Sequence, residues 1–166
     1  NSELTSVLGN FYVSGLTAGQ ETRMSGFSFS GEMNCTGAGT LRMNGVQVGD
    51  SLTCTGLKKV TLHDVEIIKS LSASQVTDCY IRRSTITKTA TIPGNQDANG
   101  QPNRLVVLQS TIKEKLTSRA AKAWIGYSNL EESFLEGTLE IVKNEFYGER
   151  SANLQGGIGI DLNGTN

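Results

Sequence analysis

A short apolar motif returns along this chain about every 19 residues, and this period constrains the fold more than any other feature. Each copy begins with two apolar residues separated by one spacer residue. Two corner residues follow, and then a second pair of apolar residues that are also separated by one spacer residue. Three consecutive copies carry it at Leu41, Met43, Val46 and Val48, then at Val60, Leu62, Val65 and Ile67, then at Cys79, Ile81, Ser84 and Ile86. A repeat of this length predicts a solenoid of stacked coils, in which each coil contacts only its neighbours.

Equivalent apolar positions form columns that predict the core. The second apolar residue of the motif gives Leu8, Met24, Met43, Leu62, Ile81, Val107, Ile125 and Ile141. The position five residues later gives Val13, Phe29, Val48, Ile67, Ile86, Ile112, Leu130 and Phe146, and the position nine residues later gives Met33, Leu52, Leu71, Ala90, Leu116 and Phe134. Polar residues alternate with these apolar ones, which is the period of a half-buried strand and not of an amphipathic helix.

The predicted fold is therefore all-β: a single-stranded parallel β-helix (β-solenoid) of about eight coils of 16–20 residues, forming one domain over residues 1–166. Equivalent strands of successive coils are expected to stack about 4.8 Å apart. The lack of a strict hexapeptide period favours a right-handed helix. Residues 93–104 hold both prolines and predict a loop, residues 118–124 suit a short helical turn, and residues 155–166 form an irregular terminal coil.

Charge and hydropathy exclude some classes of function. The net charge of −1 and a pI near 5.9 do not indicate a nucleic-acid or anionic-membrane partner, and no apolar run is long enough for a transmembrane segment. Residues 125–166 carry seven acids and two bases, a net of −5, whereas the remainder carries +4. Ends of opposite sign favour head-to-tail contact, although scattered surface charge is an equal alternative.

Few residues suggest chemistry, and we expect no catalytic residue, metal site or cofactor. Cys35 and Cys54 lie at equivalent positions of adjacent coils, within disulfide range, but their side chains point the same way, so two buried free thiols are the favoured interpretation. His63 is the only histidine and is expected at an exposed corner beside Asp64. The acids Asp50, Asp64, Glu66 and Asp78 form no stacked pair in this register.

Two sets of outward residues suggest binding. Trp124, Tyr80 and Tyr127 are candidates to contact a glycan or a partner protein, with a tryptophan covered by the 93–103 loop as the alternative. Outward bases form either a weak anion-binding groove or an ordinary solubilising surface; they are Arg42, Lys69, Arg82, Arg83, Lys88, Lys113 and Lys115.

The two ends of the solenoid lack a recognisable cap. Open edges of parallel sheets expose unpaired backbone groups, which predicts end-to-end polymerisation with further copies of the chain. The candidate assembly residues are Leu4, Val7 and Leu8 at one end and Ile158, Ile160 and Leu162 at the other.

Residues 46–54, with two alternating valines followed by Gly49, Asp50, Ser51, Leu52, Thr53 and Cys54, resemble the bactofilins. The resemblance covers residues 24–92 well and 105–154 loosely. It implies a right-handed β-helical core and a polymer-forming bacterial scaffold. The inserted loop, the cysteines and the absence of proline-rich tails depart from that family.

Three functions follow, in order of preference. The first is a non-enzymatic structural protein that stacks end to end into a filament, located outside the cell or on its surface, with a cytoplasmic scaffold as the alternative location. The second is an adhesin or phage-fibre-like module that binds a glycan or another surface protein. The third is a polysaccharide lyase or hydrolase, for which no carboxylate cluster is visible.

Overall fold

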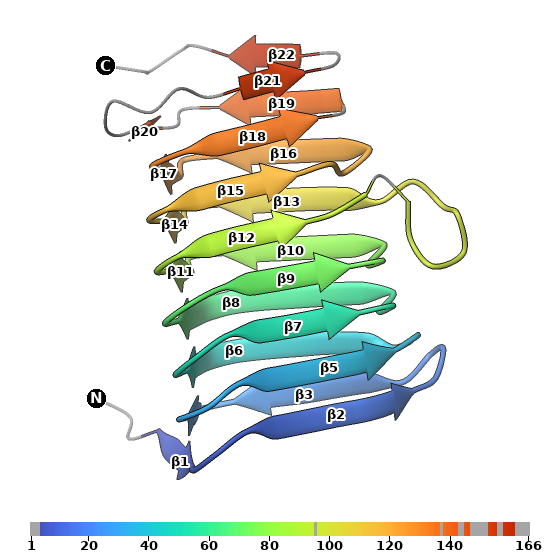
Figure 1. Cartoon of the computed structure of the whole chain (residues 1–166), viewed down its shortest axis with the longest axis vertical. Helices are drawn as coiled ribbons and strands as arrows, with labels where there is room; N and C mark the ends of the chain where they lie inside the picture. Colours follow the sequence, from blue (N-terminus) through green and yellow to red (C-terminus); the bar gives the residue numbers. More distant parts are fainter. Residues whose placement is uncertain are drawn as a thin grey trace.

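The chain winds into a parallel β-solenoid of about seven turns, and the described residues contain no helix (Figure 1). The computed structural model describes residues 4–94, 96–136, 138–142, 145–146, 153–155 and 158–161, with side chains through Leu135. The predicted fold class is confirmed, with about seven turns where the motif count indicated eight. The helical turn expected at residues 118–124 is wrong, since this segment joins two strands.

Three columns of strands form three faces, and every strand pairs in parallel with its equivalents in adjacent coils. The first face contains β3 (Glu21–Ser25), the first half of β6 (Thr40–Val48), the first half of β8 (Lys59–Ile67), β10 (Asp78–Arg82), β13 (Arg104–Leu108), β16 (Lys122–Gly126), β19 (Thr138–Val142) and β22 (Ile158–Asp161). The narrow second face contains β1 (Thr5–Val7), β4 (Phe27–Phe29), the second halves of β6 and β8, β11 (Thr85–Ile86), β14 (Thr111–Ile112), β17 (Asn129–Leu130) and β20 (Glu145–Phe146).

The third face is an eight-stranded sheet of β2 (Phe11–Leu16), β5 (Met33–Gly37), β7 (Leu52–Thr55), β9 (Leu71–Ser74), β12 (Thr89–Ile92), β15 (Lys115–Ser118), β18 (Ser133–Glu136) and β21 (Asn153–Gln155). In Figure 1 these strands run left to right in front while the first face returns behind them and the chain climbs from N to C. The solenoid is therefore right-handed.

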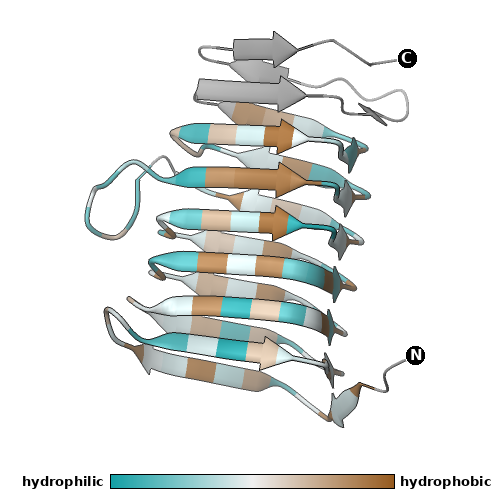
Figure 2. Cartoon of the chain, turned by 180° about the vertical axis from the view of Figure 1, so that it is seen from behind, coloured by the Kyte–Doolittle hydropathy of each residue, from teal (hydrophilic) through white to brown (hydrophobic). Residues whose placement is uncertain are grey.

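The core consists of apolar columns that run through the coils. Hydrophobic bands lie side by side from strand to strand in Figure 2. The predicted core residues Val48, Ile67, Ile86, Ile112, Leu130, Met43, Leu62, Ile81, Val107 and Ile125 are all buried. Ile141 pairs with Ile125 in the same column, but its side chain lies outside the described part of the chain.

The predicted register is wrong in the first coil. Val7, and not Val13, pairs with Phe29, while Val13 pairs with Cys35 on the third face. Leu8 does not join a core column; it lies between β1 and β2 and is 87% exposed. The first coil has a neighbour on one side only, so its apolar residues constrain the register less than those of an interior coil.

A second difference occurs at β18, where Ser133 and Leu135 face inward and Phe134 faces outward. The corner between Leu130 and Ser133 holds two residues, one fewer than the corner between Ile112 and Leu116. A shift of one residue moves every side chain of a strand to the opposite face.

The corner between the first and second faces repeats the same backbone conformation in successive coils. Its residues all have positive φ; they are Gly26, Gly45, Asp64, Arg83, Gln109 and Tyr127. Glycine adopts this conformation without strain and other residues adopt it rarely, so its recurrence at a fixed position indicates a bend that the coil geometry requires.

A column of buried serines lies beside this corner. Ser84, Ser110 and Ser128 occupy the inward position that Val46 and Val65 fill in earlier coils. The Val65 N–H donates to Ser84 Oγ at 3.1 Å, and the Ser84 N–H donates to Ser110 Oγ at 3.2 Å. Each hydroxyl in turn donates to the carbonyl two residues before it, so these polar side chains are satisfied inside the core.

The loop between β12 and β13 is fixed at both of its ends. Asn103 is buried, donates from Nδ2 to the Gly94 carbonyl and accepts from the Ala121 N–H. Asp97 accepts from the Thr77 hydroxyl, and this bond lowers the pKa of the Asp97 carboxyl.

Candidate functional site

The outward side of the first face carries a groove of about 770 Å³. Its central row consists of equivalent residues on β6, β8, β10, β13 and β16, which are Arg42, Thr61, Tyr80, Val106 and Trp124. The row on one side adds Thr40, Lys59 and Arg104. The row on the other side adds Asn44, His63, Arg82 and Leu108. Strand alternation positions all of them, because the residues between them are in the core.

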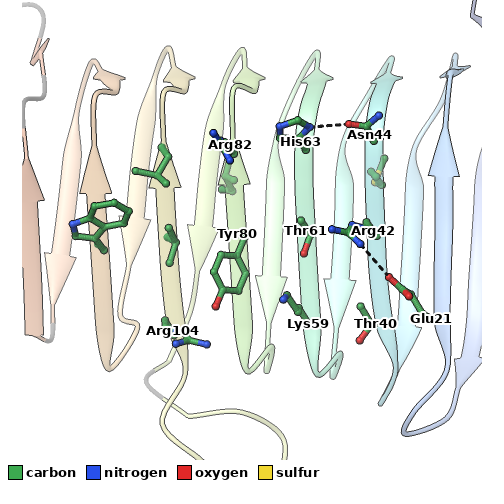
Figure 3. A pocket seen from close by; sticks show the side chains of 15 residues that line it. Glu21, Thr40, Arg42, Asn44, Lys59, Thr61, His63, Tyr80, Arg82 and Arg104 are labelled. Carbon is green, nitrogen blue, oxygen red and sulfur yellow. Dashed lines mark hydrogen bonds and ion pairs between the residues drawn. The ribbon is translucent and has the colours of Figure 1, made fainter.

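Tyr80 lies at the middle of the groove between two cations. Lys59 Nζ is 4.7 Å from the centre of the Tyr80 ring, and the Arg104 guanidinium is 5.5 Å from it. The two cations come from β8 and β13, the strands that flank β10, and Figure 3 shows them on opposite sides of the ring. Cation–π contact with the Tyr80 ring helps to fix the positions of both charges.

Positive charge exceeds negative charge in the groove. Four cations line it, Arg42, Lys59, Arg82 and Arg104, whereas Glu21 is its acidic lining residue. Glu21 is shared between Arg23 at 2.7 Å and Arg42 at 4.0 Å. The hydrogen bond from Arg23 lowers the pKa of the Glu21 carboxyl, so this group is ionised at neutral pH.

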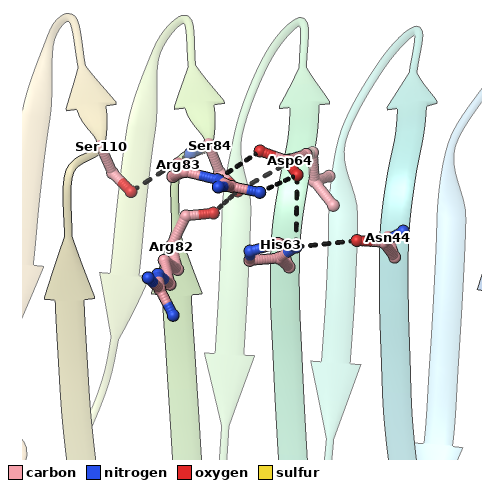
Figure 4. A network of polar contacts seen from close by, with 8 residues as sticks. Asn44, His63, Asp64, Arg82, Arg83, Ser84 and Ser110 are labelled. Carbon is pink, nitrogen blue, oxygen red and sulfur yellow. Dashed lines mark hydrogen bonds and ion pairs between the residues drawn. The ribbon is translucent and has the colours of Figure 1, made fainter.

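One edge of the groove continues into a polar network at the corner (Figure 4). His63 Nδ1 lies 2.7 Å from Asn44 Oδ1 and 3.3 Å from Asp64 Oδ2. Asp64 accepts from Arg83 Nε at 2.8 Å and from Nη2 at 2.6 Å, and this bidentate pair lowers the pKa of the Asp64 carboxyl. Asn44 and Asp64 thus position the His63 imidazole, and no Ser or Thr hydroxyl among the described side chains is hydrogen-bonded to it.

The other acids that the sequence singled out are paired along the solenoid axis. Asp50 accepts from Lys69, Asp78 accepts from Arg104 at 2.9 Å, and Glu66 accepts from the Gln47 amide at 3.0 Å. They lie on different columns, with no two carboxylates facing each other. Among the described side chains, no group of three or more His, Cys, Asp or Glu residues lies close enough to hold a metal ion.

The three cysteines are free and buried in the core. A hydrogen bond with Cys35 and burial raise the pKa of the Cys54 thiol, and burial raises the pKa of the Cys79 thiol to about 12. The Cys54 and Cys79 thiols are therefore protonated at neutral pH, whereas the hydrogen bond with Cys54 lowers the pKa of the Cys35 thiol.

The structure brings together two of the three aromatic candidates. Tyr80 and Trp124 both line the groove, whereas Tyr127 lies at the positive-φ corner and is 54% exposed. Arg42 and Arg82 of the basic candidates line the groove; Lys69 and Arg83 are engaged in ion pairs away from it, and Lys88, Lys113 and Lys115 lie on other faces.

Sequence reasoning missed Lys59 and Arg104. The available signal was their shared position, two residues before the central row, in coils adjacent to Tyr80.

The residues expected at the solenoid ends are partly visible. Leu4 and Leu8 are exposed and Val7 is half-buried in β1. Ile158 and Ile160 lie on β22 with side chains outside the described part, and Leu162 lies outside the described residues altogether. Within those residues, no helix is long and apolar enough to cross a membrane.

No family model, no curated protein and no solved structure matches this chain.

Proposed function

We propose that this chain is a non-enzymatic scaffold whose copies stack end to end, each continuing the solenoid of the next. The observation that carries this proposal is the match between the two ends. At one end β1, β2 and β3 each pair with one strand only, and at the other β20, β21 and β22 do the same among the described strands.

The open strands occur in the same order on the same faces. A second copy placed on the C-terminal end would set β1 on β20, β2 on β21 and β3 on β22, all in parallel. Unpaired strand edges recruit further strands, because each free backbone N–H and C=O gains a partner. A head-to-tail contact that does not close on itself generates a filament.

Apolar surface at the N-terminal end supports the same contact. Val7, Phe11 and Val13 are only partly buried, whereas their equivalents one coil further on, Phe29, Met33 and Cys35, are at most 2% exposed. Leu8 and Tyr12 add exposed apolar area there. Burial of these side chains beneath another coil would contribute about 25 cal/mol for each Å² removed from water.

The resemblance to bactofilins agrees with this proposal. The charge distribution does not add to it, because residues 1–32 at the end opposite to the acidic residues 125–166 carry three acids and one base, a net of −2. The surface location expected from the sequence stays a prediction.

Electron microscopy of the purified chain across a concentration series tests the proposal. We expect long unbranched rods of uniform width. Val13→Glu places a charge at the open end and should abolish the rods, while Gln101→Glu adds the same charge on the exposed inserted loop and should leave them intact. Compact monomers at the highest concentration, or rods of unchanged length from Val13→Glu, would contradict end-to-end stacking.

A further inference from the structure

The groove on the first face carries positive charge along the solenoid axis. Four consecutive coils each contribute one cation, from Arg42 on β6, Lys59 on β8, Arg82 on β10 and Arg104 on β13. Lys59 and Arg104 share one row of the groove, Arg42 belongs to the central row and Arg82 to the row on the other side. Successive coils are about 4.8 Å apart, so the cations are spread over roughly 15 Å of the axis. A ligand that contacted all of them would be elongated, would lie across the strands and would carry repeated negative charge.

Much of this charge is uncompensated. Among the described residues, neither Lys59 nor Arg82 has a carboxylate partner, and Arg42 reaches Glu21 only at 4.0 Å. Arg104 is the one strongly paired member, at 2.9 Å from Asp78. An anionic ligand could therefore pair with Lys59 and Arg82 without displacing an ion pair, and would share Arg104 with Asp78.

The aromatic residues distinguish between two kinds of linear polyanion. Proteins bind single-stranded nucleic acids by stacking bases on open aromatic faces. Lys59 and Arg104 lie 4.7 and 5.5 Å from the centre of the Tyr80 ring, so a base stacking on this ring would compete with both cations. Thr40, Thr61, Val106 and Trp124 supply the mixed hydroxyl and apolar lining that suits a sugar ring, which presents C–H groups and hydroxyls.

We infer that this groove binds an acidic polysaccharide, with carboxylate or sulfate groups against the cations and sugar rings against the lining between them. Guanidinium groups form two parallel hydrogen bonds with carboxylate or sulfate, which suits Arg42 and Arg82 to this ligand. The inference concerns a face of each copy and does not depend on stacking.

The test uses the chain's only tryptophan, since Trp124 lines the groove and its emission reports occupancy. The probes are heparin for sulfate and polygalacturonate for carboxylate, with neutral dextran and an oligothymidylate for comparison. We expect heparin or polygalacturonate to change the emission saturably, and dextran and the oligothymidylate to bind weakly. Binding of heparin alone would identify sulfate as the recognised group, and binding of both would identify shared anion recognition.

The decisive variant combines Lys59→Gln and Arg82→Gln, which removes two charges and keeps side-chain length. We expect its affinity for the acidic polysaccharide to fall by about tenfold or more, with a weaker dependence on salt. The matched control combines Lys88→Gln and Lys113→Gln, two exposed lysines outside the groove, and should stay within about twofold of the parent. Both should melt at the parental temperature, because all four side chains lie outside the core.

Three results would overturn the inference: no binding of either polyanion, an equal loss of affinity in both double variants, or tighter binding of oligothymidylate than of the acidic polysaccharides.

Discussion

The first coil and the central coils use the same columns of apolar residues but bury them to different extents. In the centre, Leu52 and Leu71 are completely buried, whereas Phe11, their equivalent in the first coil, is only partly buried. The difference arises from the number of neighbours, because a central coil is covered on two sides and the first coil on one. Burial in a solenoid therefore belongs to the interface between coils and not to a coil by itself.

The largest expected effect is that of a charge in a central coil. Val65→Asp would place a carboxylate at a position that is 2% exposed and packed in the core. A buried charge without a partner should cost about 4 kcal/mol or more. Chemical denaturation followed by circular dichroism measures the loss, and a variant as stable as the parent would show that the column does not face inward.

The comparison becomes sharper when one apolar side chain is truncated to alanine in each of the two regions. Leu62→Ala removes a fully buried side chain and should lower the free energy of unfolding by about 2–5 kcal/mol. Val13→Ala removes a half-buried side chain at the end and should cost about 1 kcal/mol or less in the monomer. Equal losses in dilute solution would mean that the end coil is already covered.

A smaller effect is expected for the serine column, which occurs only in the later coils. Ser84→Ala would leave the Val65 N–H without its acceptor inside the core and should cost about 1–3 kcal/mol. Ser25→Ala changes an exposed serine near the open end, and its effect should stay within about 0.5 kcal/mol. Native-state hydrogen exchange at the Val65 amide would report the lost bond directly, and unchanged protection would contradict its role.

The smallest expected effect is the loss of stability at acidic pH. Ion pairs between neighbouring central coils lower the pKa values of Asp50 and Asp64, through hydrogen bonds from Lys69 and Arg83. Their stabilising contribution is present above the ordinary aspartate pKa of 3.8 and is lost as the pH falls through the lower folded values. Melting temperatures should therefore be flat from pH 7 to 5 and decrease below about pH 4.

Asp64→Asn should reduce this acid-dependent decrease slightly, because the variant no longer carries the carboxylate. Glu114→Gln, at an exposed position with no ion pair among the described residues, should leave the pH profile unchanged. If both variants had the same profile as the parent, the Asp64–Arg83 pair would contribute nothing measurable.

The sequence predicted the central coils well because the period and the apolar alternation agree there. From Met24 to Ile125 the predicted marker column matches the strand pairing residue for residue. The first coil was not predictable in the same way, since Leu8 and Val13 also fall at suitable intervals and only pairing with β4 and β5 decides between registers.

The buried serines and the groove were predictable only in part. The repeat places Ser84 at an apolar position of the motif but does not indicate that Ser110 and Ser128 share its column. All three serines are buried because each hydroxyl pairs with backbone groups. Tyr80 and Trp124 were expected to face outward, but contact with Lys59 and Arg104 depends on how side chains of neighbouring coils meet.

The positive-φ corner recurs in successive coils, so the rod consists of successive complete turns. Thr40 pairs with Lys59, so residues 40–58 form one complete circuit that begins and ends at the same point of the cross-section. Removing those 19 residues would join Gly39 to Lys59 where Thr40 now stands and shorten the rod by one strand spacing, without rotating any later strand. A deletion or insertion of 19 residues at this position would thus change the length of the rod by one turn and leave the remaining strand pairs in register.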